Sequence, residues 1–235
     1  PYLVRHGRVY SRFEVMANGI ALELLQYVPL DAPIKISRLT VRNLSGRTRH
    51  LTVTAYVEWV LGTSSAVTAP SVSTEVDAAT GALLARNLAS GPAARVAFVD
   101  LRGRQAAWTG DRREFIGRNG TLERPAALVG RTAVSGRTGA GLDPCGALQA
   151  PLVLAANSSV EIVWLLGEAA TTLEAQATIE RWRGEDVDAS LKGVRRDWNA
   201  VLGAVAVQTP DRSFDVMLNG WLLYQTLACR VQSRS

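Results

Sequence analysis

Apolar and polar positions alternate with a period of two in several short segments of the first 170 residues. The alternation is clearest from His50 to Val60, and it also runs through Ile34 to Val41. A period of two is typical of β-strands that bury one face. Between Val9 and Val28, Asn18-Gly19 separates two apolar runs and predicts a tight hairpin. The pattern predicts a mainly β domain in which antiparallel sheets form a sandwich.

Later strands are predicted in sequence-adjacent pairs, each joined by a short turn. The expected pairs are 73–77 with 82–86, 96–101 with 105–109, and 147–154 with 160–166. Their turns contain glycine or asparagine, which tolerate a left-handed backbone. The sequence therefore predicts consecutive strands that are mostly antiparallel neighbours.

The period changes to that of an α-helix after residue 170. A helix is predicted from Thr171 to Gly184 and a second from Val187 to Leu202. A short strand is expected from Ala204 to Gln208. Thr209-Pro210-Asp211 then predicts a third helix, with threonine as its cap and proline at its first position. This last helix is apolar on several sides, which predicts burial on several sides.

These elements predict two segments with a boundary near residue 208. Residues 1–208 are expected to form a mainly β domain, which includes the helices near 171–202, and residues 209–235 a separate helical segment. Pro1 is not an initiator methionine, and the apolar stripe of the last helix runs to the end of the sequence. The sequence is therefore interpreted as a part of a longer protein.

Composition and charge exclude several classes of protein. Apolar residues are 47% and charged residues 20% of the chain, as in ordinary folded proteins. The net charge of +5 comes from arginines spread along the sequence, whereas nucleic-acid binders concentrate them. No run approaches the roughly 20 apolar residues that span a bilayer, so no direct membrane contact is expected. Cys145 and Cys229 are predicted to be buried, reduced thiols.

The sequence contains histidines, glycines and carboxylates, but not at the spacing that metal sites, phosphate loops or catalytic acid pairs require. His6 and His50 are the only histidines and have no second ligand nearby, so no metal or cofactor is predicted. Gly136 to Gly141 could hold phosphate, but a flexible loop is favoured. Carboxylates that could form an acid pair are Glu14, Glu23, Asp31, Glu58, Glu75, Asp77, Asp111, Glu114 and Glu123. No spacing supports such a pair, and surface solvation is favoured for each.

The irregular region from Gly110 to Gly146 is the best candidate for a functional surface. Asp111 to Gly120 combines charges, an aromatic residue and two glycines in one loop. Its arginine and asparagine side chains could bind sugar hydroxyls or phosphate, and Trp108 just before it could stack on a sugar. A solvated loop anchored by Phe115 and Ile116 is an equally supported alternative. Most of the other tryptophans are predicted to lie in the core.

Five segments of the chain resemble the cellobiose phosphorylase family, formerly called glycosyltransferase family 36. They are residues 10–62, TEVDAATGALLARN (74–87), DRREFIGRNGTLERPAAL (111–128), GAGLDPCGALQ (139–149) and FDVMLNGWLLYQTLACRV (214–231). The likeness is greatest to the C-terminal phosphorylase-like region of cyclic β-1,2-glucan synthases. It covers nearly the whole chain in the same order, although Asn219-Gly220 places poor helix formers inside the last helix.

The resemblance implies that residues 1–208 form an N-terminal β supersandwich domain and that residues 209–235 form α-helical linker segments that lead into an (α/α)6 barrel. In this family the catalytic aspartate and most phosphate ligands belong to the barrel, and no residue here matches that aspartate. The expected function is a non-catalytic domain of a β-glucan-processing glycoside phosphorylase or cyclic β-1,2-glucan synthase, with a role in assembly and carbohydrate contact. The segment is expected to be inactive alone, whereas its parent is an inverting phosphorylase or glycosyltransferase.

The resemblance also implies partners and a location. Family phosphorylases commonly form homodimers, with supersandwich loops that reach a neighbour's active site. By position this implies Arg112, Glu114, Arg118 and Asn119 as accessory substrate-binding residues, beside Trp108. The synthase likeness implies a cytoplasmic location next to a membrane-embedded transferase of the inner membrane. Two other functions stay open: an independent carbohydrate-binding module for β-glucans, and a stand-alone hydrolase that uses two strand carboxylates.

Overall fold

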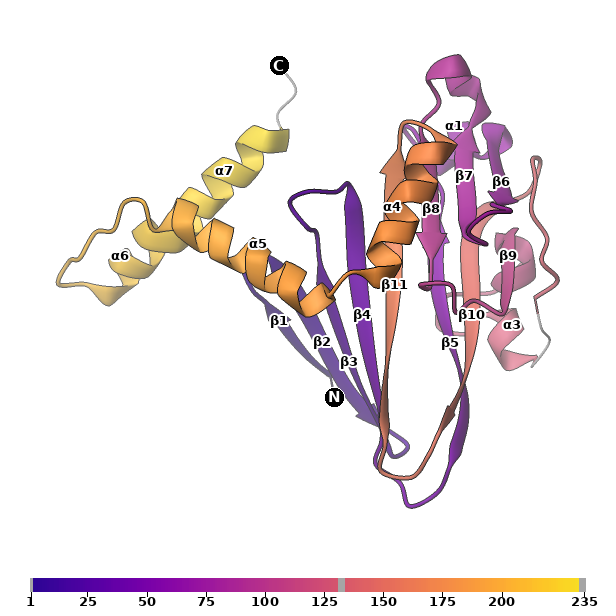
Figure 1. Ribbon diagram of the computed structural model, residues 1–235, viewed down its shortest axis with the longest axis horizontal. Helices are drawn as coiled ribbons and strands as arrows, with labels where there is room; N and C mark the ends of the chain where they lie inside the picture. The colour runs from indigo at the N-terminus through magenta and orange to yellow at the C-terminus, as the bar shows by residue number, and fades with distance from the viewer. Residues whose placement is uncertain (1, 131–133, 233–235) are drawn as a thin grey trace. The chain divides into compact units, whose positions relative to one another are not determined.

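The computed structural model describes residues 2–130 and 134–232 (Figure 1). The chain divides into two compact units. The first, called the sandwich unit, contains residues up to Arg5 and from Ser11 to Glu185. The second, called the helical unit, contains His6–Tyr10 and the chain from Asp186 onward. The backbone therefore passes between the units three times, twice at the connection between the first two strands.

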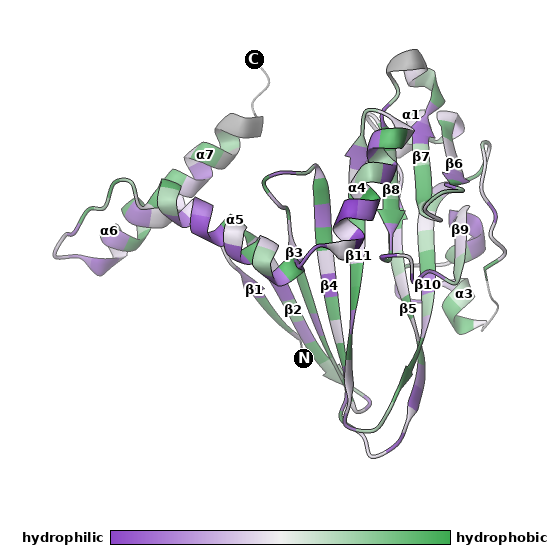
Figure 2. Cartoon of the chain, in the orientation of Figure 1, coloured by the Kyte–Doolittle hydropathy of each residue, from purple (hydrophilic) through white to green (hydrophobic). Residues whose placement is uncertain are grey.

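Eight strands form the larger sheet in the order β1-β2-β3-β4-β11-β8-β7-β6. Their bounds are β1 Tyr2–His6, β2 Tyr10–Ala17, β3 Ile20–Tyr27, β4 Ile34–Asn43, β6 Val72–Val76, β7 Leu83–Asn87, β8 Val96–Asp100 and β11 Ser159–Ala169. The central pair is antiparallel, with Ser159 of β11 opposite Arg42 of β4. Figure 2 shows apolar and hydrophilic residues alternating along these strands, in agreement with the period of two.

Three strands form the smaller sheet in the order β5-β10-β9. They are β5 Arg49–Glu58, β10 Pro144–Leu154 and β9 Ala107–Asp111. The main core joins the two sheets, since it combines Leu83, Val99 and Ile162 of the larger sheet with Ala55 and Leu148 of the smaller one. The predicted sandwich of antiparallel sheets is thus confirmed.

Two predicted hairpins form because their turns have the required local chemistry. Asn18 and Gly19 between β2 and β3 have φ angles of 53° and 75°, the left-handed pair that a two-residue hairpin turn needs. In the second hairpin, β6 pairs with β7 from Val72 opposite Asn87 to Val76 opposite Leu83. The Asp77 carboxylate accepts hydrogen bonds from the Thr80 amide and hydroxyl at 2.8 and 2.7 Å and closes its turn.

Two other predicted hairpins are wrong. β8 and β9 follow one another in the sequence but lie in different sheets, and so do β10 and β11. The turn residues Arg102, Gly103 and Asn157 do adopt positive φ angles. Their connections nevertheless lead from one sheet to the other, because each strand pairs with a partner distant in sequence. Alternation shows that a strand has a buried face but does not identify the strand beside it.

Asn43 fixes two of the connections between the sheets. Its side chain is 1% exposed at the end of β4. The amide nitrogen donates to the carbonyls of Arg47 at 2.7 Å, Leu154 at 3.2 Å and Ala155 at 2.9 Å. Its amide oxygen accepts from the backbone N–H of Ser45 at 3.0 Å. One side chain therefore holds the β4–β5 and β10–β11 connections together.

Helix α4, Thr172–Gly184, begins and ends as the sequence predicts. The Thr171 hydroxyl accepts from the Glu174 amide at 3.2 Å, and the Glu174 carboxylate accepts from the Ala170 amide at 3.0 Å. Two backbone amides at the start of the helix are satisfied in a way that is similar to a capping box, except that Glu174 accepts from Ala170 and not from the cap residue Thr171. The helix buries Ala175, Ile179 and Trp182 and packs on β8 and β11. The remaining helices of the sandwich unit are α1 Ser65–Thr68, α2 Arg112–Phe115 and α3 Ala126–Val129, with 3-10 turns at Ala69–Ser71 and Leu88–Ala93.

A buried ion pair connects the end of α4 to the larger sheet. Arg183 donates two hydrogen bonds to the Asp100 carboxylate, at 3.0 and 2.7 Å, and a third to the carbonyl of Thr80 at 2.6 Å. Gln105 also donates to Asp100 at 2.9 Å. The Asp100 side chain is 0% exposed, and the hydrogen bond to it raises the pKa of Arg183.

The helical unit contains α5 Val187–Leu202, as predicted, and then departs from prediction. The strand expected from Ala204 to Gln208 does not form. Instead, the Asn219 side chain pairs with both backbone groups of Val207, donating to its carbonyl at 2.6 Å and accepting from its amide at 2.7 Å. A side chain thus supplies the bonds that a neighbouring strand would have made.

The last helix begins two residues later than a Thr209 cap would place it. Its cap is Asp211, whose carboxylate accepts from the Ser213 amide at 2.8 Å, and Thr209 donates its own amide to Asp215. The helix runs through α6 Arg212–Val216, a π-helical turn Met217–Trp221 and α7 Leu222–Gln232. Aspartate caps a helix better than threonine does, which explains the shift.

The two cysteines differ in environment. Cys145 is buried in β10, and burial, followed by the nearby Asp111 charge, raises the pKa of its thiol. Cys229 on α7 is exposed, so the prediction that both thiols are buried is wrong for Cys229. Both are free cysteines, which agrees with the prediction that they are reduced.

Trp221 is 56% exposed, in contrast to the buried Trp59 and Trp182.

Candidate functional site

The candidate loop starts where β9 runs directly into α2. Asp111, the last residue of β9, caps the helix by accepting a hydrogen bond from the Arg113 amide at 3.0 Å. Phe115 and Ile116 are 2% and 0% exposed and form a second small core. The Phe115 ring stacks on Tyr56 of β5 with ring centroids 5.0 Å apart. The expected anchoring of the loop by Phe115 and Ile116 is confirmed.

Arg112 binds two carboxylates that border the loop. Its Nε donates to Glu58 of β5 at 2.9 Å, and its Nη1 lies 3.7 Å from the Asp143 carboxylate. The Tyr56 hydroxyl also donates to Glu58, at 2.8 Å. The hydrogen bond from Arg112 lowers the pKa of Glu58. This guanidinium therefore ties α2 to β5 and to the start of β10.

Glu114 holds the next part of the chain against α2. Its carboxylate accepts from the Thr109 hydroxyl at 2.5 Å and from the Ser135 amide at 2.7 Å. Burial alone would raise the pKa of Glu114, but these hydrogen bonds and the Arg137 charge outweigh burial and lower the pKa. The carboxylate therefore stays ionised well below neutral pH.

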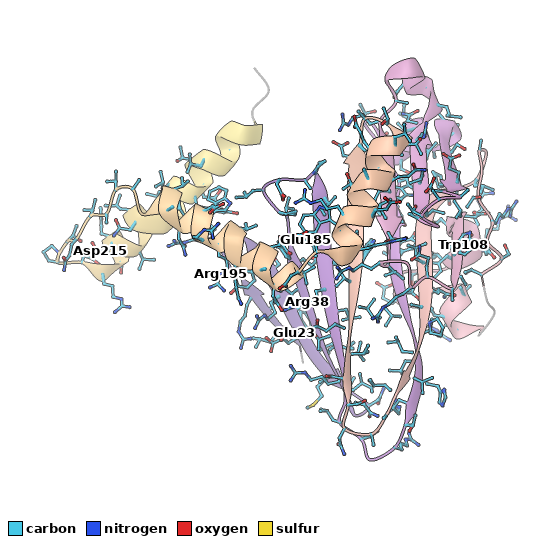
Figure 3. All side chains as sticks on the ribbon, in the orientation of Figure 1. Glu23, Arg38, Trp108, Glu185, Arg195 and Asp215 are labelled. Carbon is cyan, nitrogen blue, oxygen red and sulfur yellow. The ribbon has the colours of Figure 1, made fainter. Side chains whose placement is uncertain are left out.

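The other candidates lie apart from this pair. Trp108, labelled in Figure 3, lies on β9 opposite Leu148 of β10 and packs against the main core. Its Nε1 is buried without a hydrogen-bond partner among the described residues. Arg118 and Asn119 are exposed in the turn after α2. The structure thus places Arg112 and Glu114 on α2 with different partners, directs Trp108 inward and leaves Arg118 and Asn119 at the surface.

The glycine-rich segment before β10 joins the edges of the two sheets. The Gly136 amide donates to the Trp108 carbonyl at 2.9 Å, and the Arg137 carbonyl accepts from Gly110 at 2.7 Å on β9. Two residues further on, Gly139 forms a β-bridge with Thr74 of β6. The Gly139 amide donates to the Thr74 hydroxyl at 3.2 Å. Because the Gly136 and Gly139 amides already have partners, the segment connects β9 to β6, and these two amides are not available to hold phosphate.

A charged cleft of about 730 Å³ lies beside α2. Its lining residues are Ala69, Pro70, Asp111, Arg113, Glu114, Arg137, Gly141, Leu142 and Asp143. Within it, Arg137 Nη1 lies 3.1 Å from the Asp111 carboxylate. Only Glu114 of the predicted site residues lines this cleft. Sequence reasoning missed Arg113, Arg137 and Asp143, although all three lie in the irregular region that it singled out.

The cleft presents both hydrogen-bond donors and acceptors. Within the ranges 2–130 and 134–232, no group of three His, Cys, Asp or Glu side chains could hold a metal ion. In the same ranges, no helix is long and apolar enough to cross a membrane.

Residues 1–185 match the family profile described as Glycosyl hydrolase 94, supersandwich domain. The chain belongs to the glycosyl hydrolase 94 family. Residues 197–235 match the catalytic domain profile of the glycosyl hydrolase 94 superfamily. These matches confirm the resemblance to the phosphorylase family and the supersandwich fold.

Relatives in the glycosyl hydrolase 94 family are much longer than this chain. The cyclic beta-(1,2)-glucan synthase NdvB of Rhizobium meliloti (strain 1021) is 37% identical over 232 residues, which are 98% of this chain and 8% of the relative. The N,N'-diacetylchitobiose phosphorylase of Vibrio furnissii is 27% identical over 247 residues, which cover 99% of this chain and 30% of the relative. The chain therefore spans less than a third of either protein.

Among solved structures, a putative kojibiose phosphorylase from human microbiome matches with a TM-score of 0.54 and 9% identity. The match covers 93% of this chain and 26% of the other. At this identity the likeness concerns the fold alone, and it agrees with the glycosyl hydrolase 94 supersandwich.

The role of Glu114 leads to a pH-dependent prediction. Because the pKa of Glu114 is lowered in the folded state, its contribution to stability is present above the ordinary value of 4.5 and is lost as the pH falls through the lower folded value. The Ser135 amide proton should therefore titrate below pH 4.5 in NMR spectra. Glu114→Gln should abolish this titration and cost about 1 kcal/mol of stability. Glu123→Gln, at an exposed position of the same loop, should leave it unchanged, whereas an unchanged titration in Glu114→Gln would disprove the assignment.

Proposed function

We propose that this chain is the non-catalytic supersandwich domain of a β-glucan-processing glycoside phosphorylase or cyclic β-1,2-glucan synthase, and that it supports the assembly of the catalytic domain. One observation carries this proposal: the chain passes from the supersandwich profile at residues 1–185 into the catalytic-domain profile at 197–235. The names of the two relatives supply the substrate class, a β-linked glucan or a related oligosaccharide.

The surface of the last helix supports a role in assembly. Phe214, Val216 and Trp221 are 60%, 62% and 56% exposed in α6 and the π-helical turn. Large apolar side chains concentrated on one segment mark an interaction surface. We assign its partner as the (α/α)6 barrel of the parent chain, because this segment itself matches the catalytic-domain profile. Residues 209–235 then serve as the linker that leads into the barrel.

The charged groups of the candidate loop support a non-catalytic role. Asp111 caps α2, Glu114 holds Ser135, and Arg112 joins Glu58 to α2. A general acid must be able to exchange a proton with substrate, whereas these groups have structural partners. The chemistry of the parent, an inverting phosphorylase or glycosyltransferase, belongs in this proposal to the barrel. We further propose that the parent protein forms a homodimer and that this domain lies on the cytoplasmic side, beside a transferase in the inner membrane.

The exposed part of the loop favours sugar contact as a second role. Arg118 and Asn119 are exposed beyond the end of α2, and the charged cleft lies beside Glu114. Their donors and acceptors suit sugar hydroxyls. The alternative function, an independent carbohydrate-binding module for β-glucans, would use the same groups without a barrel.

An activity assay tests the non-catalytic assignment. The purified chain, incubated with β-1,2-gluco-oligosaccharides and inorganic phosphate, is expected to release no glucose 1-phosphate, because the proposal places the catalytic acid in the barrel. Release of glucose 1-phosphate above a buffer control would overturn the proposal.

Calorimetric titration with β-1,2-glucans separates scaffold from binding module. A scaffold should give no binding heat, whereas micromolar binding that Arg118→Ala abolishes would favour the module. Arg196→Ala is the matched control, because the Arg196 side chain is 79% exposed on α5. Trp108→Ala also tests the module, and its unfolding should be measured in parallel because Trp108 packs against the core.

A further inference from the structure

The connection between β1 and β2 belongs to the helical unit. His6–Tyr10 groups with the chain from Asp186 onward, although the strands on either side belong mainly to the sandwich unit. The Gly7 amide donates to the Tyr10 carbonyl at 2.8 Å and closes a turn. Arg195 of α5, labelled in Figure 3, lies over the Tyr10 ring with its Cζ 5.7 Å from the ring centroid. This distance is in the range of a cation–π contact.

Arg8, in the same turn, occupies the space beside Gly220. Gly220 is buried in the π-helical turn. A Cβ built on this glycine would lie 2.5 Å from Arg8 Nη2 and 3.2 Å from Arg8 Cζ. A real Cβ atom essentially never comes so close to another heavy atom. The guanidinium, which is the far end of a flexible side chain, therefore fills this space and would have to shift to admit a side chain at 220.

The neighbouring Asn219 contacts the segment that precedes the last helix. Its side chain binds the amide and carbonyl of Val207, at 2.7 and 2.6 Å. Further along, Tyr224 of α7 packs edge-on against Trp198 of α5, with centroids 5.0 Å apart. The two poor helix formers thus lie where the helix is held by other parts of the helical unit. Single π-helical turns inside α-helices often mark such specialised positions.

We propose that Arg8 and Gly220 form a contact that sets the position of the first catalytic-domain helix on the β1–β2 turn. Arg8 belongs to the part of the chain that matches the supersandwich profile, and Gly220 to the part that matches the catalytic-domain profile. In this contact the guanidinium of Arg8 fills the space that glycine leaves open at 220. The assignment of the helix to a catalytic domain rests on the proposed function, but the contact itself does not.

Hydrogen exchange on the full 235-residue chain, followed by NMR, tests this proposal. The matched control is Gly193→Ala, because a Cβ on Gly193 of α5 would have no atom within 4 Å. That substitution should slow exchange in α5 about fivefold, the advantage of alanine over glycine in a helix. Gly220→Ala should instead not slow the hydrogen exchange of the amides of residues 217–224. It should accelerate exchange of the Gly7 amide about threefold or more, because Arg8 is displaced.

Arg8→Ala is the second variant in this hydrogen-exchange test. It should accelerate exchange of the Gly7 amide to the same extent as Gly220→Ala. The double variant should show no further acceleration, because both changes remove one contact. In the Arg8→Ala background, Gly220→Ala should slow helix exchange as Gly193→Ala does. Two results would overturn the proposal. One is slower helix exchange in the single variant Gly220→Ala together with unchanged exchange of the Gly7 amide. The other is unchanged exchange of the Gly7 amide in Arg8→Ala. Release of glucose 1-phosphate would overturn the proposed function and leave this contact intact.

Discussion

Replacing Arg183 by methionine is expected to lower the free energy of unfolding by about 3–5 kcal/mol, because it leaves the charge of Asp100 buried without its partner. The Asp100 side chain is 0% exposed, and Arg183 supplies two of its hydrogen bonds. Truncation of the arginine also leaves the Thr80 carbonyl without its donor. The change should appear as a lower urea midpoint at an unchanged slope.

The matched control is Arg196→Met on α5. The Arg196 side chain is 79% exposed and pairs with the adjacent Asp197, so its loss should change stability by less than about 0.5 kcal/mol. The double variant Arg183→Met with Asp100→Leu should recover much of the loss, because no unpaired charge remains. If Arg183→Met were as mild as Arg196→Met, the ion pair would not contribute as the structure indicates.

Replacing Asn43 by alanine should destabilise the sandwich by about 2–4 kcal/mol, since it removes the hydrogen bonds of this side chain and leaves the buried Leu154 carbonyl without its side-chain donor. The amide nitrogen of Asn43 serves three carbonyls, and two of these belong to the connection between β10 and β11. Loss of this side chain should therefore loosen both connections between the sheets. Urea denaturation measures the total cost, and hydrogen exchange at 44–48 and 155–158 locates it.

Asn43→Asp tests the donor role of the amide nitrogen separately from the acceptor role of the amide oxygen. The aspartate keeps an oxygen for Ser45 but turns a second, charged oxygen towards the carbonyls of Leu154 and Ala155. It should therefore be at least as destabilising at neutral pH as Asn43→Ala. Asn199→Ala, at an exposed position on α5, should be nearly neutral. A neutral Asn43→Asp would show that the three carbonyls do not depend on this amide.

Features with local causes were predictable from the sequence. The limits of α4 and α5 follow from Thr171 and from the spacing of apolar residues, and the β2–β3 turn follows from Asn18-Gly19. The position of the last helix was missed by two residues because two capping residues compete at 209 and 211. Here the intrinsic preference for aspartate decided the outcome.

Features that depend on distant residues were not predictable. Nothing in the local pattern of β11 identifies β4 and β8 as its neighbours. For the same reason the cleft was only partly anticipated, since Arg137 reaches Asp111 from a segment 26 residues further along the chain. The loop was identified because charges and glycines gather there. Which of its side chains face one another depends on the β-bridge between Gly139 and Thr74.

The make-up of the small sheet has a consequence for the order in which the nascent chain folds. β5 must wait for β10, whose residues lie about 90 positions later, whereas β2, β3 and β4 can pair as soon as they emerge. Contacts between distant residues form slowly because a long loop must close first. The apolar face of β5, which contributes Ala55 to the main core, should therefore remain open to water, and to chaperones, until residues 144–154 have left the ribosome.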